Sequence, residues 1–262
     1  MLTLSSVTKN FGGLQVLQNI SLVIPARGIF GLIGPNGAGK TTVFNLITGL
    51  TAPTSGTIEF RGQTLTGLAP HRVTRCGVAR TFQNIRIFKE MTLAENVLVA
   101  IGRQGHHGAM RVLWPSARLR AAQQRERAEA TELLAKVGLA DKAAIMAGKL
   151  SYGEQRRLEI ARALATVPKL LLLDEPAAGM NGAEKQQLME EIVKLEESGL
   201  SILIIEHDMR FVMRLCWHIA VLNFGQLIAQ GTPEEIRANP AVVEAYLGEE
   251  SAEDGAPVQS LL

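Results

Sequence analysis

A glycine-rich loop that ends in a lysine and two threonines is the first candidate site in this sequence. Residues Gly34 to Thr41 fit the pattern G-x-x-x-x-G-K-[ST] at every fixed position. Glycines let the backbone approach a phosphate closely and turn its N–H groups toward the anion. Lys40 brings a compact charge to the β- and γ-phosphates, and the hydroxyl of Thr41 suits Mg²⁺, which prefers oxygen ligands. A chance glycine-rich turn is the alternative, but it does not explain why a lysine and threonines follow. We expect the nucleotide phosphates to be bound by Gly34, Pro35, Asn36, Gly37, Ala38, Gly39, Lys40, Thr41 and Thr42.

Two consecutive acids, Asp174 and Glu175, follow an apolar run at 170–173. A buried strand that delivers polar groups at its C-terminal end is the usual place for a ligand site in an open α/β sheet. Asp174 would hold Mg²⁺ directly or through water, and Glu175 would orient or deprotonate an attacking water. Taken alone, the pair could equally be two solvated acids at a strand end. A second apolar run, 202–205, leads similarly toward His207, although a single histidine after a strand is more often structural than catalytic.

Strands and helices are predicted to alternate along the chain around these residues. A period-two pattern over residues 2–24 predicts antiparallel strands, and the short apolar runs before the loop, the acids and the histidine predict buried strands. A helix pattern follows the loop from Lys40 to Leu50. Strands separated by helices indicate an α/β core, into which a mostly helical stretch is inserted. The expected parts are an N-terminal β subdomain with the phosphate loop (1–84), a helical subdomain (85–155), the remainder of the α/β core (156–247) and a flexible acidic tail (248–262).

Composition and charge argue against several classes of protein. The chain has 262 residues, of which 47% are hydrophobic and 20% charged, and this composition is typical of a globular fold. The net charge is only +2, and the arginines between Arg111 and Arg127 are mixed with acids, which favours a solvated helix face over a nucleic-acid patch. No apolar run reaches the roughly 18–20 residues that span a bilayer, and no secretory signal is apparent, so we expect the chain in the cytoplasm. The two isolated cysteines, Cys76 and Cys216, are interpreted as buried thiols. His106 and His107 are interpreted as part of a polar loop, and Trp114 and Trp217 as packing side chains.

A further stretch shows which family this sequence resembles. The run from Leu150 to Glu154, L-S-Y-G-E, is similar to the signature motif of ABC-type ATPases, usually written LSGGQ. The other marks of that family occur in the matching order along the chain. Gln83 resembles the Q-loop glutamine, His207 resembles the switch histidine, and Phe11 lies where an aromatic residue stacks on adenine. The resemblance covers nearly the whole chain and implies an α/β P-loop NTPase core of the ABC ATPase type, with an N-terminal antiparallel β subdomain and an inserted helical subdomain.

The resemblance also implies a mechanism in which two ATPase subunits work head to tail. ATP and Mg²⁺ bound to the phosphate loop and acids of one subunit are covered by the signature of the other. A serine hydroxyl and N–H groups at a helix N-terminus form an anion site, which agrees with that role. The residues assigned by the resemblance are Ser151, Tyr152, Gly153 and Glu154 for the signature, Thr41, Gln83 and Asp174 for the metal, and Glu175, His207 and Gln83 for catalysis.

Three positions depart from the commonest family pattern. Phe11 stands where tyrosine is usual, which keeps the stacking face and loses only a hydroxyl. Tyr152 replaces the first signature glycine, and we expect function to be kept because the backbone there need not be strained. Asn181 stands where the D-loop usually has aspartate, so hydrogen bonding is kept and the charge is lost.

Several stretches are similar to one subgroup, the ATP-binding subunits of branched-chain or hydrophobic amino-acid importers. They comprise residues 79–88, 175–181, 205–209 and 239–248, with an insertion around 102–120. In that subgroup two related ATPase subunits, the first of which this chain resembles, pair with two transmembrane permease subunits and a periplasmic or extracellular substrate-binding protein. This implies a place at the cytoplasmic face of the plasma membrane and no nucleic-acid partner. The stretch from Asn84 to Glu95 follows the Q-loop glutamine and is expected to face the membrane partner.

Three other hypotheses compete with amino-acid import. The ATPase subunits of lipopolysaccharide export have the same single-domain layout and a similar signature. Soluble ABC proteins that act on ribosomes or DNA generally carry two cassettes in one chain or long coiled coils, and the sequence has neither. A phosphate-loop kinase outside the ABC family would have no use for the signature around Ser151 together with Gln83 and His207.

Overall fold

The computed structural model describes residues 1–102 and 117–250, which form two compact units. The predicted positions Arg111, His106, His107 and Trp114, and most of the predicted tail, lie outside these residues. The first unit contains residues 1–80, 169–176 and those from 196 onward, and the second contains 81–168 and 177–195. No helix in the described residues is long and apolar enough to cross a membrane.

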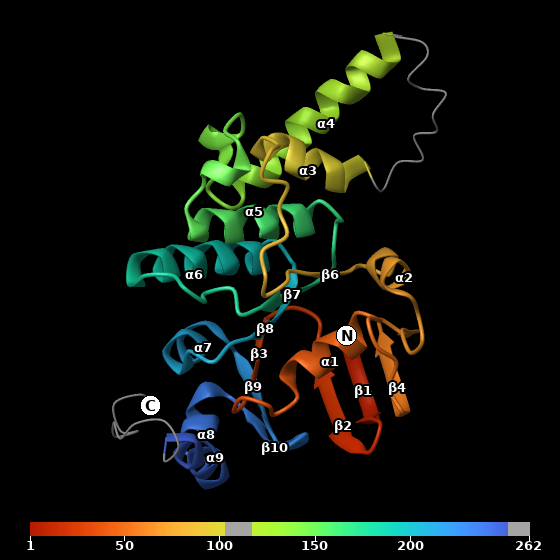
Figure 1. The fold of residues 1–262 in the computed structure, drawn as a ribbon, viewed down its shortest axis with the longest axis vertical. Coiled ribbons are helices and arrows are strands. Elements are labelled where there is room, and N and C mark those ends of the chain that lie inside the picture. Colours follow the sequence, from red (N-terminus) through yellow and green to blue (C-terminus); the bar gives the residue numbers. More distant parts are fainter. Residues whose placement is uncertain (103–116, 251–262) are drawn as a thin grey trace. The chain divides into compact units, whose positions relative to one another are not determined.

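The first unit contains an antiparallel sheet at its N-terminus (Figure 1). The strand order is β2-β1-β4-β5. These strands are β1 (Leu2–Phe11), β2 (Leu14–Ile24), β4 (Ser55–Phe60) and β5 (Gln63–Thr64). Buried and exposed residues alternate over much of β2 and β4, as expected for strands with one face on the core. The predicted antiparallel N-terminal strands are therefore confirmed.

A second sheet of six strands, in the order β10-β9-β3-β8-β7-β6, forms the α/β core of this unit. All neighbouring pairs are parallel except β9 and β10. The strands are β3 (Ile29–Ile33), β6 (Val78–Arg80), β7 (Leu170–Asp174), β8 (Ser201–Ile205), β9 (His218–Asn223) and β10 (Gln226–Gly231). Every residue of β3, β7 and β8 is buried, which confirms the prediction drawn from their continuous apolar runs.

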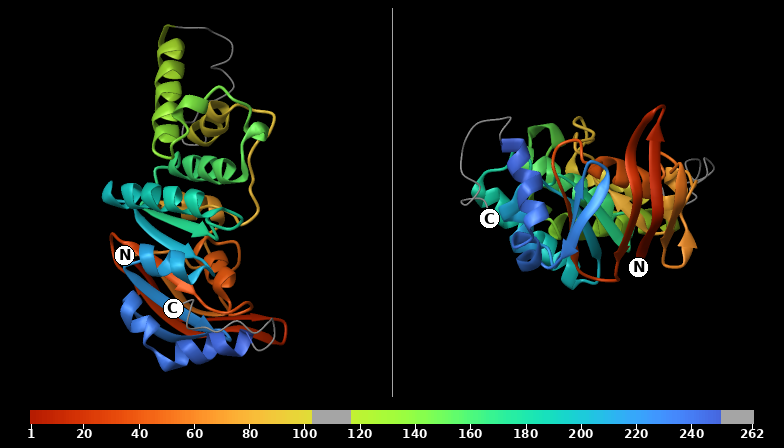
Figure 2. Two further views of the ribbon diagram at one scale, coloured as in Figure 1. Left: turned by 90° about the vertical axis from the view of Figure 1, so that its left-hand side faces the viewer. Right: turned by 90° about the horizontal axis from the view of Figure 1, so that it is seen from below.

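Five helices of the described residues complete the first unit. They are α1 (Lys40–Ile47), α2 (Pro70–Arg75), α7 (Met209–Leu215), α8 (Pro233–Arg237) and α9 (Pro240–Glu250). Phe44 of α1 and Phe60 of β4 are fully buried in the core that the two sheets share. Helix α1 ends earlier than predicted because Thr48 caps it and Gly49 turns the chain with φ +71°. Helices α8 and α9 pack on the hairpin of β9 and β10 (Figure 2). The predicted tail from residue 248 begins within α9.

The second unit is mainly helical (Figure 1). Its elements are α3 (Leu93–Gly102), α4 (Ala117–Ala135), η2 (Ala140–Lys142), η3 (Ala147–Lys149), α5 (Tyr152–Leu164) and α6 (Gly182–Glu197). Arg125 and Arg127 are exposed on α4, as expected for a solvated face. Within this unit, α5 and α6 are joined by an ion pair of 3.1 Å between Arg157 and Glu191.

Candidate active site

The glycine-rich loop connects β3 to α1 and requires glycine for steric reasons. The φ of Gly34 is +147°, and a Cβ atom there would lie 2.0 Å from the carbonyl oxygen of Leu222. Gly39 is the N-cap of α1 with φ +102°, and a Cβ atom there would lie 2.6 Å from the Leu17 Cδ2 atom. An L side chain would be strained or would clash at both positions. Packing against the neighbouring strands therefore determines the path of the loop.

Lys40 lies over the loop instead of extending into solvent. Its residue exposure is 8%. Its ammonium group donates hydrogen bonds to the carbonyl oxygens of Gly34, at 2.5 Å, and Pro35, at 2.8 Å. Thr41, the next residue in the first turn of α1, is exposed, and Thr42 is half-buried. The structure thus holds a positive charge at the loop and presents a hydroxyl beside it.

The turn between β9 and β10 is hydrogen-bonded to the phosphate loop and supports it. Gly225 donates its N–H to the carbonyl of Ala38 at 3.1 Å and accepts from the N–H of Gln18 at 2.8 Å. Its φ is +74°, and a Cβ atom would lie 2.2 Å from the Val16 carbonyl oxygen. This support was not predicted from the sequence. A glycine between two apolar runs near residues 219–231 predicts a hairpin turn but not its contact with the loop.

Asp174 ends β7 and forms a buried ion pair. One Nη atom of Arg80 lies 2.6 Å from the Asp174 Oδ2 atom, and the two side chains are 7% and 4% exposed. The other Nη atom of Arg80 donates to Asn45 Oδ1 at 2.7 Å, and the guanidinium lies 5.5 Å from the centre of the Phe44 ring. Arg80 therefore links the strand that carries the acid to α1, the helix that begins at the phosphate loop. Arg80 was not predicted as a site residue, because its partners are distant in sequence.

The donors in the first unit fit a Mg²⁺ ion. Thr41 supplies a hydroxyl and Asp174 a carboxylate, and both are hard oxygen ligands. Within the described residues, no cluster of three His, Cys, Asp or Glu side chains forms a metal cage. Mg²⁺ usually needs only one or two carboxylates because substrate phosphates and water complete its coordination. The chemistry of the donor set therefore suits a metal bound together with a nucleotide.

Glu175 has an unusual backbone conformation. Its φ is +47°, in the left-handed region that non-glycine residues rarely adopt. Its N–H donates to the carbonyl of Ile205 in β8 at 2.9 Å, and its side chain is half-buried. Such a conformation costs about 1–3 kcal/mol and occurs frequently at active sites. Because β7 ends at Asp174, the side chain of Glu175 no longer follows the alternating directions of side chains along the strand.

His207 follows β8, the strand between β3 and β7. Its side chain is 61% exposed, and its Nδ1 atom lies 3.9 Å from the Glu206 Oε2 atom, which also accepts the His207 N–H at 3.2 Å. Because β3, β8 and β7 are parallel, their C-terminal ends share one edge of the sheet. That edge brings together the phosphate loop, His207, Asp174 and Glu175.

Phe11 lies at the end of β1, in the same unit, and is 46% exposed. It pairs with Leu14 across the turn formed by Gly12 and Gly13. The ammonium group of Lys9 lies 4.7 Å from the centre of its ring. The hairpin thus presents an accessible aromatic side chain, as the predicted contact with a nucleotide base requires.

The signature motif begins helix α5 in the second unit. Ser151 is the N-cap, with its hydroxyl accepting the N–H of Glu154 at 3.3 Å, while the Glu154 carboxylate accepts the N–H of Ser151 at 2.9 Å. Although burial raises the pKa of Glu154, hydrogen bonds from Lys142 and Ser151 outweigh it and hold that pKa below its usual value. The Ser151 oxygen is an acceptor in the cap, so its O–H remains a donor toward an anion. Glu154 thus supports the serine in this structure.

The two unusual residues of the second unit are accommodated without strain. The φ of Tyr152 is not positive, which confirms that the backbone tolerates a side chain there. Its hydroxyl oxygen accepts from an Nη atom of Arg156 at 3.1 Å, and its ring lies against Gly179. Asn181 accepts the N–H of Glu184 at 3.0 Å and donates its own N–H to that carboxylate at 3.0 Å, so it caps α6.

Gln83 also belongs to the second unit. It is exposed in the segment 81–88, which has no regular secondary structure. Its carbonyl oxygen accepts a hydrogen bond from Arg156, a residue that sequence reasoning did not identify as functional. The described structure thus gives two groups of candidate residues. The phosphate loop, the two acids, His207 and Phe11 belong to the first unit, and Gln83 and the signature belong to the second.

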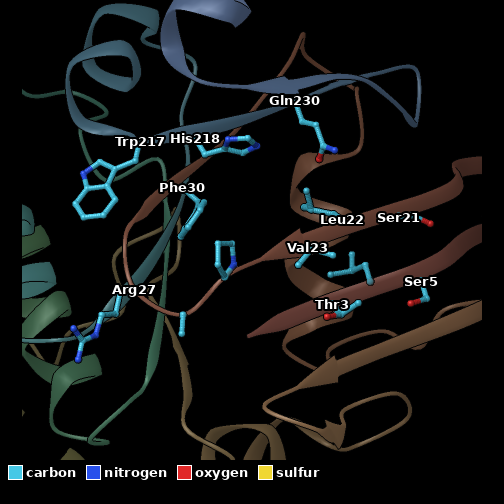
Figure 3. Close-up of a pocket in the computed structure, with 13 residues that line it drawn as sticks. Thr3, Ser5, Ser21, Leu22, Val23, Arg27, Phe30, Trp217, His218 and Gln230 are labelled. Atoms are coloured by element: carbon cyan, nitrogen blue, oxygen red, sulfur yellow. The ribbon is translucent and has the colours of Figure 1, made fainter.

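An open cavity of about 680 Å³ lies in the first unit but contains none of the predicted site residues (Figure 3). Phe30 and His218, at the beginnings of β3 and β9, line it, so it lies at the end of the sheet opposite the phosphate loop. Trp217 lies at its rim and is 59% exposed, so the interpretation as a packing residue holds only for the edge that contacts Gly28.

The two cysteines of this unit differ in burial. Cys216, next to Trp217, is 4% exposed, and burial raises the pKa of its thiol to about 12. Cys76 is only half-buried, contrary to expectation.

Comparisons with known proteins agree with the geometry. A family model described as ABC transporter matches residues 17–178, and one described as branched-chain amino acid ATP-binding cassette transporter matches residues 226–252. The high-affinity branched-chain amino acid transport ATP-binding protein BraF of Pseudomonas aeruginosa is 46% identical over 95% of this chain and 98% of that protein. LivG of Salmonella typhimurium, with the same description, is 48% identical over the same shares.

Two further relatives define the fold and the nearest alternative. The crystal structure of an ATP-binding cassette of an ABC transporter in its ADP conformation superposes with a TM-score of 0.83 at 31% identity, covering 95% of this chain and 98% of that one. The lipopolysaccharide export system ATP-binding protein LptB of Haemophilus influenzae is 34% identical over 95% of this chain and 98% of that protein. The expected ABC ATPase fold is thus confirmed.

Proposed function

The chain belongs to the ABC transporter family of ATP-binding proteins, and from this premise we propose that it hydrolyses ATP to power the import of branched-chain or other hydrophobic amino acids. The observation that carries ATP hydrolysis is the meeting of the phosphate loop, Asp174, Glu175 and His207 at one edge of the sheet, and the amino-acid cargo is supported by the similarity to BraF and LivG. An anion loop, a metal carboxylate and a water-orienting base in that arrangement are the recurring parts of a phosphoryl-transfer site.

In this proposal, the first unit binds and cleaves the nucleotide. The phosphate loop and Lys40 bind the β- and γ-phosphates, and Phe11 stacks on the base. Glu175 accepts a proton from the attacking water or orients it, and His207 contacts the γ-phosphate. Mg²⁺, held by Thr41 and Asp174 with a contribution from Gln83, would neutralise charge on the phosphate oxygens.

The second unit supplies the complementary half of a site. Ser151 and the N–H groups at the start of α5 would cover the γ-phosphate bound to another ATPase subunit, because the serine hydroxyl can donate while its oxygen caps the helix. One chain therefore has two half-sites, and ATP joins two subunits. That second subunit is either a copy of this chain or a related ATPase.

A membrane partner is supported by an apolar patch on the second unit. The side chains of Phe88, Met91, Ile145 and Met146 are 41%, 37%, 38% and 41% exposed. They are neighbours because Thr92 pairs with Met146 and Leu93 donates its N–H to the carbonyl of Ile145. Apolar side chains gathered on a surface indicate a protein interface. The patch includes residues of the stretch 84–95 that we expect to face the two permease subunits.

Cysteines introduced into this patch should cross-link to a membrane subunit. Met91→Cys in a Cys76→Ser background, labelled with a reagent that has one thiol-reactive and one photoreactive end, is expected to form a cross-linked product with a membrane subunit on irradiation of native membranes, detected as a band shift and identified by mass spectrometry. The matched control is Val193→Cys on α6, which is 39% exposed in the same unit but lies outside the patch. Equal cross-linking at positions 91 and 193, or none at any position from 84 to 95, would contradict the proposed interface.

The proposed function is tested by purifying the Glu175→Gln chain with ATP from detergent-solubilised native membranes. Recovery of two permease subunits and a second ATPase, with bound branched-chain amino acid on the associated binding protein, is the expected result. Recovery of lipopolysaccharide-export subunits would favour the alternative suggested by the relative at 34% identity. Recovery of ribosomes or nucleic acid alone would refute a transport function.

A further inference from the structure

One face of helix α5 holds the backbone of the loop that contains Gln83. One Nη atom of Arg156 donates to the carbonyl oxygen of Phe82 at 2.5 Å, and the other donates to the carbonyl oxygen of Gln83. The side chain of Arg156 is only 3% exposed. Carbonyl groups in a segment without regular secondary structure lack the backbone partners that a helix or sheet provides, so other groups must donate to them. A single guanidinium, with its planar fork of donors, satisfies two of them in succession.

Two further side chains extend the contact along the same face. Glu159 and Arg162 follow Arg156 at intervals of three residues, which places all three on one side of the helix. Glu159 accepts the N–H of Arg86 at 3.3 Å and lies 3.5 Å from Arg156, while Arg162 donates to the carbonyl oxygen of Arg86. Burial raises the pKa of Glu159, although the Arg86 N–H and the Arg156 guanidinium oppose that shift. The loop is thus held at three of its residues, Phe82, Gln83 and Arg86.

The same loop is fastened at its other end. Asn96 of α3 is fully buried, accepts the N–H of Phe88 at 2.9 Å and donates to the Phe88 carbonyl at 2.9 Å. The guanidinium of Arg162 lies 5.0 Å from the centre of the Phe88 ring. The backbone of this exposed loop is therefore held by hydrogen bonds at both ends. We expect its side chains to keep a fixed position relative to α5.

We propose that Arg156 is a positioning residue for Gln83, which it ties to the helix that begins at Ser151. The inference rests on the proposed function, in which Gln83 contributes to holding Mg²⁺ beside the γ-phosphate. The physical consequence is that the catalytic glutamine and the signature serine belong to one rigid element. The Arg156 fork fixes the main chain of Gln83, and without it the side-chain amide of Gln83 would be spread over several positions.

Arg156→Gln should reduce kcat of the purified transporter complex by about 10²-fold, because a displacement of roughly 1 Å at a catalytic group has that effect. The KM for ATP should change less than about twofold, since the nucleotide-binding loop belongs to the other unit and ground-state binding is retained. Arg156→Lys reaches one carbonyl with a single ammonium and should give an intermediate kcat. Amide hydrogen exchange of residues 82–86 should be faster in Arg156→Gln, and exchange of residues 34–42 should be unchanged.

The matched control is Arg157→Gln. Arg157 is the next residue of α5 and forms an ion pair with Glu191, with 13% of its side chain exposed. Its guanidinium donates to Glu191 at 3.1 Å and to the carbonyl oxygen of Val137 at 3.4 Å. Arg157→Gln should therefore keep kcat within about twofold of the parent while losing a comparable amount of thermal stability. Equal losses of kcat in the two variants would overturn the proposal, because they would indicate a general effect of destabilising α5.

A double-mutant cycle with Gln83→Ala distinguishes the proposal from an indirect effect. If Arg156 acts through Gln83, the double variant should have the kcat of Gln83→Ala alone, within about twofold. Additive losses, or unchanged hydrogen exchange at 82–86 in Arg156→Gln, would overturn the inference. Either outcome would contradict only the role of Arg156, provided that the parent complex hydrolyses ATP and contains its permease subunits. A parent complex without either would contradict the proposed function itself.

Discussion

Glu175→Gln is expected to keep ATP binding and to reduce steady-state turnover by roughly 10²–10⁴-fold, the usual contribution of a general base. Gln has the shape of Glu, so the turn at φ +47° and the hydrogen bond from its N–H to Ile205 should be retained. The amide cannot accept a proton from water at neutral pH, whereas the binding groups of the phosphate loop are unchanged. ATP should therefore accumulate in a joined pair of subunits.

The measurement combines an ATPase assay with size-exclusion chromatography in the presence of ATP and Mg²⁺. Glu59→Gln is the matched control, since Glu59 is an exposed glutamate of the same unit, in β4, and should retain parental turnover. The expected elution is that of a larger species for Glu175→Gln with ATP and not with ADP. Turnover at the parental rate in Glu175→Gln would remove Glu175 from the mechanism.

Lys40→Ala should abolish nucleotide-dependent activity by weakening ATP binding. Lys40 places its ammonium group over the loop through hydrogen bonds to the carbonyls of Gly34 and Pro35. Two charge-assisted hydrogen bonds to phosphate, at about 1.5–3 kcal/mol each, correspond to a loss of about 10²–10⁴-fold in affinity. Removal of an exposed surface lysine should not reduce the affinity for ATP to a comparable extent.

Binding of a fluorescent ATP analogue, titrated against purified protein, measures this loss directly. Lys194→Ala is the control, because Lys194 is exposed on α6. Thermal unfolding of both variants without nucleotide should resemble that of the parent, so that weakened binding cannot be ascribed to unfolding. Normal hydrolysis by Lys40→Ala would refute the assignment of the phosphate loop.

Features that depend on a contiguous run of residues were predictable. The phosphate loop, the acids after a strand and the signature each place their chemistry within a few residues, and the local backbone presents it. Buried strands such as β7 and β8 were predictable for the same reason, since a continuous apolar run suits a strand covered on both faces. The family resemblance then ordered these motifs along the chain.

The contacts that join distant residues were not predictable from their types. Arg80 and Arg156 look like ordinary charged residues in the sequence, yet one holds Asp174 and the other holds the loop of Gln83. The ion pair between Arg157 and Glu191 is a further contact of this kind, since it joins helices that a strand of the other unit separates in the chain.

The types and spacing of the motif residues were enough to predict the chemistry of this chain, whereas the contacts that hold its parts in place depend on the assembled sheets. Motif residues act through groups that their own loop or helix terminus presents, so their identity and spacing are sufficient to recognise them. Strand order is different, because β8 separates β3 from β7 although it follows both in the chain. Hydrogen bonds across such neighbours form only after the sheet has assembled, and no local pattern records them. The left-handed turn at Glu175 and the support of the phosphate loop by Gly225 follow from that assembly.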